Sequence, residues 1–297
     1  MPTYDNGAGT LTQEYSENFA LVFKVAKQAI YNVNSVNPLN WMDKGIIRNG
    51  VSVEDAVIQL VTGNEWKGET QTGENLNAPS YPNLKVQYHK TWNGKQFKTT
   101  YSEEQFSKVL LSGGSEIDAS TKIVSNLTES EGYEDYVACK GILTSGVTAG
   151  NIKKADDTAH STSGYTVNAD LIKAIKNVTD EMMFINNSYV GGNFKTRTPF
   201  ERIRIIMPYK VYNAMNIDVL ASLYNLEKAE LNSKISKIDD DGKVYILDEF
   251  SCLKYTRLYR MTSKFIEDGL YYNYWLTVDR MYGTSNLFKA AYLTIAK

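Results

Sequence analysis

Two histidines and two cysteines are the residues best suited to nucleophilic or metal-dependent chemistry in this chain. His89 and His160 are the only histidines, so a histidine-based triad or a histidine-ligated metal would need one of them. His89 lies among the polar positions of an alternating segment and His160 lies in a polar loop, so we expect both to be solvated. Cys139 and Cys252 lie more than a hundred residues apart, which indicates neither a disulfide framework nor a zinc knuckle. Cys139 has the setting of a residue in a helix core.

Motifs for calcium binding, phosphate binding and acid–base catalysis are incomplete in this sequence. Residues 239–242 place three aspartates side by side, whereas a calcium loop needs carboxylates at alternate positions, so a turn is the better interpretation. The glycine pairs at 113–114 and 191–192 lack the partner residues of a phosphate-binding loop. The carboxylate pairs at 54–55 and 103–104 are typical of a solvated face. We therefore expect no catalytic, cofactor-binding or metal site, and a protein that is not an enzyme.

Composition narrows the class of protein further. The 297 residues include 32 Lys and Arg against 34 Asp and Glu, a net charge of −2, which argues against a dedicated DNA-coating or membrane-surface protein. No apolar run is long enough for a membrane helix, and the N-terminus lacks the pattern of a signal peptide, so we expect no membrane partner. The 21 tyrosines combine apolar area with a polar tip, which suits surfaces that become buried against partners.

Hydrophobic periodicity predicts a mixed α+β chain without internal repeats. Residues 11–33 are expected to form an N-terminal helix or arm, and the polar stretches 62–81 and 145–166 are expected to be long loops. The expected helices share an apolar stripe at helical spacing, and cover 115–143, starting at a capping box, 171–185 and 211–226. The expected strands are rich in β-branched and aromatic residues, and cover 51–62, 203–207, 243–248, 252–265 and 271–296.

The clearest local signal lies between residues 84 and 101. Leu84, Val86 and Tyr88 alternate with polar residues, and Asn93–Gly94 then precedes a second alternating run. Asn-Gly between alternating runs predicts a two-residue hairpin, because a type I′ turn needs positive φ at both central positions. An isolated two-stranded ribbon is only marginally stable in water. Its apolar face must therefore lie against its own domain or against another molecule.

Several short fragments in collinear order carry a resemblance to a known family. They are Asn37-Pro-Leu39, Pro82-Asn-Leu-Lys-Val86, Ile217-Asp-Val-Leu-Ala221, Val244-Tyr-Ile-Leu-Asp-Glu-Phe250 and Tyr271-Tyr-Asn-Tyr-Trp275. Together with the order of the predicted elements, they resemble the major capsid proteins of tailed phages that have the Hong Kong 97-like fold, in particular those of the phi-29 group of short-tailed phages. The fragments cover most of the chain.

The resemblance implies an α+β capsid fold in five parts. These are an N-terminal arm (1–45), an E-loop β-ribbon (46–101), a spine helix with its connecting loop in the peripheral domain (102–166), an axial domain (167–255) and the closing strands of the peripheral domain (256–297). The sequence stops at Lys297, directly after the last of these strands. We therefore expect the C-terminal immunoglobulin-like decoration of some family members to be absent.

The implied function is that of a major capsid protein that self-assembles, as hexamers and pentamers, into an icosahedral shell around phage double-stranded DNA. The implied partners are copies of the chain, a portal, a separate scaffolding protein and, through weak non-specific contact, the DNA. The implied location is the virion, with the host cytoplasm during assembly. The expected subunit-interface residues lie on the E-loop, and they are Val86, Tyr88, Trp92 and Phe97.

Alternative functions remain open at this point. An encapsulin-like nanocompartment shares the fold and would hold a cargo enzyme instead of DNA. A monomeric cytosolic binding protein or enzyme would stay near 33.5 kDa at all concentrations. A nucleic-acid stacking ribbon is suggested by lysines interleaved with aromatic residues between 85 and 98, but the rest of the chain offers no basic surface to extend it.

Overall fold

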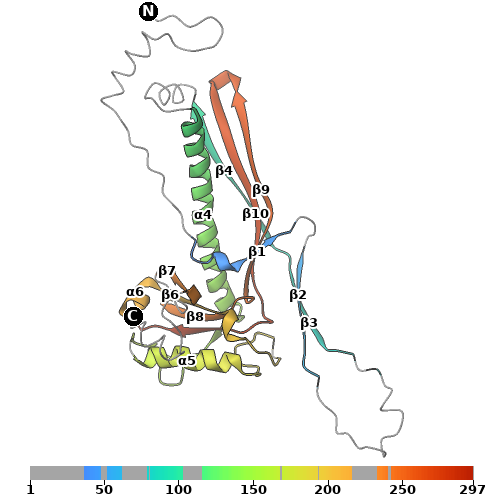
Figure 1. Cartoon of the computed structure of the whole chain (residues 1–297), viewed down its shortest axis with the longest axis vertical. Coiled ribbons are helices and arrows are strands. Elements are labelled where there is room, and N and C mark those ends of the chain that lie inside the picture. The colour runs from blue at the N-terminus through green and yellow to red at the C-terminus, as the bar shows by residue number, and fades with distance from the viewer. Residues whose placement is uncertain are drawn as a thin grey trace, which may run out of the picture. The chain divides into compact units, whose positions relative to one another are not determined.

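The computed structural model describes residues 37–47, 52–61, 79, 81–102, 116–167, 169–192, 194–215, 233–239 and 242–296, with the backbone alone from 116 to 124 (Figure 1). These residues form two compact units. The first unit contains the described residues within 1–37, 93–137 and 256–280. The second unit contains the described residues within 38–92, 138–255 and 281–297.

The described residues contain both helices and strands. The α-helices are α4 (Glu116–Thr148), α5 (Ala169–Met183) and α6 (Tyr209–Ala214), and the 3₁₀ turns are η1 (Asn40–Met42), η3 (Phe200–Arg202) and η4 (Glu267–Gly269). The strands are β1 (Asp43–Ile46), β2 (Val53–Ile58), β3 (Leu84–His89), β4 (Trp92–Ser102), β5 (Lys153–Lys154), β6 (Ile203–Pro208), β7 (Ile235–Ile238), β8 (Lys243–Asp248), β9 (Cys252–Ile266), β10 (Tyr271–Thr284) and β11 (Ala290–Thr294).

A five-stranded sheet in the order β5-β11-β8-β6-β7 is the base of the second unit. Strand β8 pairs antiparallel with both β11 and β6, whereas β5 and β7 run parallel to their neighbours. Because β8 lies at the centre of this sheet, its residues from Val244 to Asp248 are all buried. A continuous apolar run is typical of a strand that is covered on both faces.

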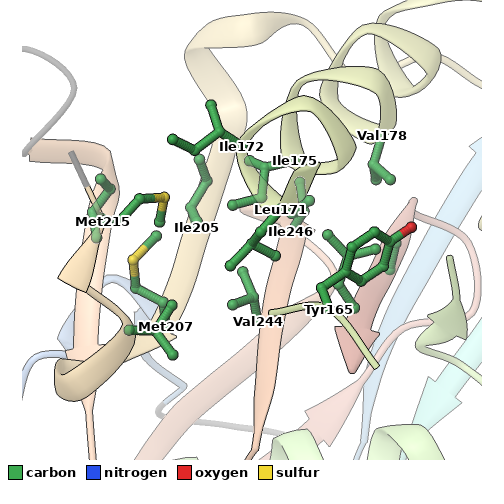
Figure 2. Packing of buried hydrophobic residues seen from close by; sticks show 14 of the residues in the cluster. Tyr165, Leu171, Ile172, Ile175, Val178, Ile205, Met207, Met215, Val244 and Ile246 are labelled. Atoms are coloured by element: carbon green, nitrogen blue, oxygen red, sulfur yellow. The ribbon is translucent and has the colours of Figure 1, made fainter. Parts of the chain in front are cut away.

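Helix α5 covers this sheet with the apolar stripe that the sequence predicts (Figure 2). Leu171, Ile175, Val178 and Met182 are buried, and they pack in one cluster with side chains of β6, β8 and β11. Their spacing of four, three and four residues places them on one face of the helix. Burial of each such side chain stabilises the fold by about 1.5–3 kcal/mol. The predicted helix and strands of this region are therefore confirmed.

In the first unit, helix α4 packs on β9, β10 and β4, which are consecutive neighbours in one sheet. Leu127 of α4 is buried against Leu276 and Val278 of β10. Strands β9 and β10 are joined through η4, and Leu270 takes the left-handed conformation with φ 49° to complete the turn. The predicted helix is confirmed within the described residues, and it continues to Thr148.

Arg280 adds a polar contact between this sheet and the same helix. Its guanidinium contacts Glu131 and lies 3.0 Å from Asp135 Oδ1, and the two carboxylates are one turn apart on α4. Both carboxylates are buried. Because a buried carboxylate is costly unless it is paired, Arg280 fixes β10 to this face of α4.

The predicted hairpin at Asn93–Gly94 is wrong. Both residues lie inside the single strand β4, and β3 pairs instead with β2. Strand β4 is a neighbour of β10, and side-chain hydrogen bonds join them, with 3.1 Å between Gln96 Nε2 and Thr277 Oγ1. An eleven-residue strand gains more hydrogen bonds and burial from this distant partner than from a local turn. Tertiary pairing therefore overrides the local turn signal.

Several other sequence predictions are outside the described residues or need adjustment. Residues 11–33, most of 62–81, the capping box at 115 and residues 216–226 are outside the described residues. The run 271–296 forms two strands, β10 and β11, rather than one. The stretch 145–166 contains the end of α4 and the short strand β5, so it is not wholly a loop.

Candidate assembly surface

The β2–β3 ribbon belongs to the second unit and has two faces of different character. The strands are antiparallel, and the pairs on one face are Glu54 with Tyr88, Ala56 with Val86, and Ile58 with Leu84. We call this set of six residues the outward face. Because side chains directly opposite each other in an antiparallel pair are neighbours, the five uncharged side chains form one continuous patch.

The outward face is exposed to solvent although it is mainly apolar. Ile58 is 65% exposed, Leu84 50%, Val86 37% and Tyr88 57%. Leu60, just beyond β2, is 65% exposed as well. Large contiguous apolar patches are rare on monomeric soluble proteins, and they commonly mark interaction sites. This face of the ribbon is therefore a candidate contact surface.

The opposite face of the ribbon packs against the body of the second unit. Val57 packs beside the buried cluster of Val190, Phe194 and Leu287. Gln87 makes hydrogen bonds to the segment 284–286 between β10 and β11. On β3 the polarity is thus the reverse of the usual arrangement, since Gln87 and His89 are docked and Leu84, Val86 and Tyr88 are exposed.

His89 also lies on the docked face, and the expectation that it is solvated is wrong. Its ring is buried, and its Nε2 lies 2.9 Å from Asp55 Oδ2. Burial raises the pKa of nearby Tyr255, and the negative charge of Asp55 adds to this effect. The pattern of alternation alone does not reveal this burial, because it shows which side chains share a face and not which face is covered.

The residues that the sequence places on the interface divide between two elements. Val86 and Tyr88 lie on the outward face, as expected for a contact surface. Trp92 and Phe97 lie on β4 instead, and Phe97 packs beside Leu127 in the core of the first unit. The sequence prediction also missed the contribution of β2, namely Ala56 and Ile58. The sequence of 53–58, Val-Glu-Asp-Ala-Val-Ile, has no apolar alternation, so it gave no local signal for this face.

Helix α4 presents a second candidate surface within the first unit. Asn126, Ser130, Tyr133 and Val137 are exposed and lie at successive steps of four, three and four residues. Tyr133 is 61% exposed and Val137 45%. We call these four residues the uncharged stripe. An exposed helix face usually carries lysine and glutamate, and depletion of these residues is typical of the core of an interface.

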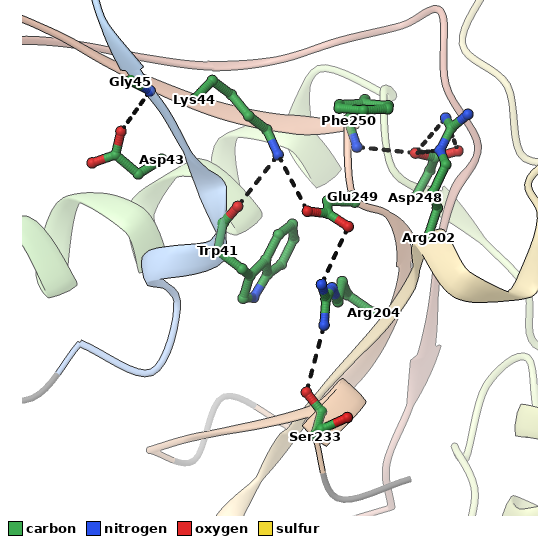
Figure 3. Close-up of polar contacts among 10 residues, drawn as sticks. All are labelled: Trp41, Asp43, Lys44, Gly45, Arg202, Arg204, Ser233, Asp248, Glu249 and Phe250. Carbon is green, nitrogen blue, oxygen red and sulfur yellow. Dashed lines mark hydrogen bonds and ion pairs between the residues drawn. The ribbon is translucent and has the colours of Figure 1, made fainter. Parts of the chain in front are cut away.

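A cluster of charged residues fixes the turn after β8 (Figure 3). Arg202 Nη2 lies 2.6 Å from Asp248 Oδ2, and the Phe250 N–H donates to Asp248 Oδ1 at 2.9 Å. Arg204 and Lys44 both approach Glu249, at 3.2 and 4.0 Å. Burial lowers the pKa of Lys44, and Glu249 opposes this effect. Since each carboxylate faces a cation, the arrangement is that of structural ion pairs and not of an acid–base pair.

Lys289 closes the C-terminal end of α5. Its ammonium donates to the carbonyls of Met182 at 3.2 Å and Phe184 at 2.8 Å, and to Asn186 Oδ1 at 2.6 Å. The side chain is fully buried, and burial lowers the pKa of Lys289 to about 8. The last carbonyls of a helix have no partner within the helix. Lys289 therefore acts as a side-chain cap at this end.

Both cysteines have the setting of core residues. Cys139 and Cys252 are buried free thiols, and burial raises the pKa of Cys252 to about 12, which keeps it protonated. Among the described side chains, no three histidine, cysteine or acidic groups gather so as to hold a metal ion. Across the same ranges, no helix has both the length and the apolar character to cross a membrane.

The fold matches solved phage capsid structures. The capsid protein in the structure of Staphylococcus phage Andhra has a TM-score of 0.71 at 11% identity, with 91% of this chain and 87% of that chain covered. The capsid of the cyanophage P-SCSP1u gives a TM-score of 0.56 at 11% identity, with 92% of each chain covered. The fold is therefore the α+β Hong Kong 97-like capsid fold, as the sequence predicts.

The sequence comparison identifies the family. The model of the Phi29-like phage major capsid protein family matches residues 6–294. The chain belongs to this family, as the resemblance in the sequence implies. It is 22% identical over 294 residues to the major capsid protein of Bacillus phage GA-1, and 21% identical over 293 residues to that of Bacillus phage PZA. These alignments cover 96% and 94% of this chain, and the chain spans 62% and 64% of those proteins.

Proposed function

We propose that this chain is the subunit of an icosahedral phage head, which assembles as hexamers and pentamers into a shell around double-stranded DNA. The observation that carries the proposal is the reversed polarity of β3, in which Gln87 and His89 are docked while Leu84, Val86 and Tyr88 remain exposed. A monomeric protein would gain stability by the opposite arrangement. Membership of a capsid family supplies the partner, which is another copy of the same chain.

We assign the β2–β3 ribbon to the E-loop (46–101) and α4 to the spine helix within 102–166. In the same scheme, residues 1–45 form the N-terminal arm, 167–255 the axial domain and 256–297 the closing strands of the peripheral domain. The outward face of one copy then packs on the uncharged stripe of α4 in a neighbouring copy. Neither set of residues contains lysine, and Lys90, whose Nζ lies 5.8 Å from the centre of the Tyr88 ring, is a charge that this contact would have to desolvate together with Glu54.

The strength of such a contact fits a shell that forms reversibly. A standard interface buries about 1,600 Å², which corresponds to a gross gain of about 40 kcal/mol at about 25 cal/mol per Å². Association entropy and side-chain ordering offset most of this gain. Each contact is then modest, and many contacts per subunit stabilise the closed shell while single subunits can still be exchanged during growth.

The proposal extends to further partners. The portal and a separate scaffolding protein are expected from the family, with assembly in the host cytoplasm and the finished shell in the virion. The net charge of −2 suits a container for DNA, because a strongly cationic lining would bind the packaged DNA tightly.

The test is the size and content of the particles that the protein forms. We expect light scattering to show a concentration-dependent transition from subunits to large particles, and electron microscopy to show closed shells. Particles from infected cells, treated with nuclease, should still hold double-stranded DNA. Shells that hold a cargo enzyme and no DNA would indicate a nanocompartment, and a species that stays near 33.5 kDa at all concentrations would refute the proposal.

A further inference from the structure

Gln87 lies between the two exposed residues Val86 and Tyr88, and its side chain links β3 to the body of the second unit through hydrogen bonds. Its Oε1 accepts a hydrogen bond from the Asn286 N–H at 2.7 Å, and its Nε2 donates to the Thr284 carbonyl at 3.1 Å. The Ser285 hydroxyl lies 3.3 Å from the same Oε1. The side-chain amide thus pairs with the backbone of 284–286 much as another peptide group would.

The segment that receives Gln87 is itself held firmly. The Ser285 N–H donates to the Ser251 carbonyl at 2.8 Å, and the Asn286 carbonyl accepts from the Gly192 N–H at 3.0 Å. The Thr284 hydroxyl accepts from Asn151 Nδ2 at 2.8 Å. Ser285 is buried, and a Cβ added at Gly191 would lie 2.8 Å from the Asn286 Cβ. Gln87 therefore attaches the ribbon to a backbone segment with little freedom to move.

The other contacts at the base of the ribbon are less directional. The hydrogen bond between His89 and Asp55 joins β3 to β2, and the His89 ring meets the body by packing beside Gly283, a contact without a defined angle. Val57 packs beside an apolar cluster, and such contacts tolerate rotation. Two hydrogen bonds from one planar amide require a defined angle at both ends. Gln87 is thus the contact that can set the direction in which the outward face points.

We propose that Gln87 is a positioning residue for assembly, which fixes the orientation of the outward face before the ribbon meets a second copy. This inference rests on the proposed function for its consequence in assembly. If the ribbon loses its fixed orientation, only a fraction of subunits present the outward face correctly. The apparent affinity for the neighbouring copy then falls to that same fraction of its full value.

The experiment compares Gln87→Met, which keeps the length of the side chain and removes the amide, with the matched control Gln96→Met on β4. Gln96 is also a strand residue with a side-chain hydrogen bond, and it is exposed. Amide hydrogen exchange is measured on the full-length subunit at a concentration too low for assembly. We expect Gln87→Met to speed exchange in the ribbon by about tenfold and to leave β8 and β11 unchanged. Gln96→Met should leave the ribbon unchanged.

A second variant, Gln87→Glu, keeps an acceptor for the Asn286 N–H and loses the donor to Thr284. It should retain part of the ribbon's protection, and in assembly assays Gln87→Met should need a higher protein concentration than Gln87→Glu. Unchanged ribbon exchange in Gln87→Met would overturn the proposal, as would equal acceleration in the ribbon and in β8, which would indicate a general loss of stability. Exchange is measured without assembly, so failure of the wild-type protein to form shells would refute the proposed function alone.

Discussion

His89 Nε2 lies 2.9 Å from Asp55 Oδ2, and this contact joins the two strands of the ribbon on its docked face. The ring of His89 is buried, and the carboxyl group of Asp55 is largely covered. A polar pair in such a setting stabilises the ribbon only while both partners are present, because a buried group without a partner retains its full cost of desolvation.

We predict that Asp55→Ala lowers the free energy of unfolding by about 1–3 kcal/mol, because it leaves the buried imidazole of His89 without its acceptor. Urea denaturation of the subunit measures this change. The neighbouring Glu54→Ala is the control, since Glu54 is exposed on the outward face and should change stability by less than about 0.5 kcal/mol. Equal stability of the two variants would show that the pair contributes nothing.

Charge on the outward face should block assembly without unfolding the subunit. Val86→Asp places a carboxylate in the centre of the exposed patch, where contact with another copy would have to desolvate it. Thr91→Asp is the matched control, because Thr91 is exposed between β3 and β4 and is not part of this face. We expect both variants to melt within a few degrees of the wild type, and only Val86→Asp to remain as subunits in light scattering. Shells of normal yield from Val86→Asp would contradict the assignment of this face.

Phe97 should behave as a core residue and not as an interface residue. It packs beside Leu127 and the β10 side chains of the first unit. Because Phe97 is half-buried, Phe97→Ala is expected to destabilise the subunit by about 2 kcal/mol, less than a fully buried phenylalanine would. Thermal unfolding compares it with Tyr88→Ala, whose side chain is 57% exposed and should leave stability unchanged. A larger loss of stability in Tyr88→Ala than in Phe97→Ala would instead place Phe97 on the assembly surface.

The lowered pKa of Lys289 predicts how the free energy of unfolding depends on pH. Its pKa is lowered to about 8 from the ordinary 10.5, so the folded state releases this proton at a lower pH than the unfolded state. Below pH 8 both states carry the charge, and the folded state bears the full cost of burying it. Between pH 8 and 10.5 the unfolded state binds more protons, so this group makes stability rise with pH.

Comparison with Lys289→Met isolates this effect from the other groups that titrate in the same range. The difference in unfolding free energy, wild type minus variant, should increase by about 3 kcal/mol from pH 8 to pH 10.5. Denaturant titrations at several pH values measure it. A difference that stays flat across this range would mean that the ammonium is fully compensated by the carbonyls of Met182 and Phe184.

The helices and the central strands could be predicted from the sequence because their hydrophobic patterns are local. The stripe of α5 and the run of β8 report burial directly, and both lie where the pattern places them. The order of the elements and a few fragments were sufficient to recognise the capsid fold. The failures concern pairing over long distances, and the Asn93–Gly94 signal shows this most clearly, since β4 is a neighbour of β10, far along the chain.

The candidate site could be predicted only in part. Alternation at 84–89 correctly groups Val86 with Tyr88, and Gln87 with His89. The alternation cannot show which face of the strand is covered, because that depends on the segment 284–286, almost two hundred residues away. From the alternation alone, the polar residues Gln87 and His89 were expected to face solvent. In the structure, both side chains make hydrogen bonds within the subunit. The uncharged stripe on α4 was readable from the sequence once the exposed face of that helix was known.

The most direct test of the central claim is a crosslink between copies of the chain. A photoreactive amino acid at position 88 would be introduced into ¹⁴N-labelled protein, which is then mixed with ¹⁵N-labelled wild type and assembled. Mass spectrometry separates crosslinks between copies from crosslinks within one copy by their isotope content. We expect position 88 of one copy to be linked to the peptide that carries Tyr133 and Val137 of another. Crosslinks found only within the chain that carries the photoreactive residue, in a protein that assembles normally, would contradict the account.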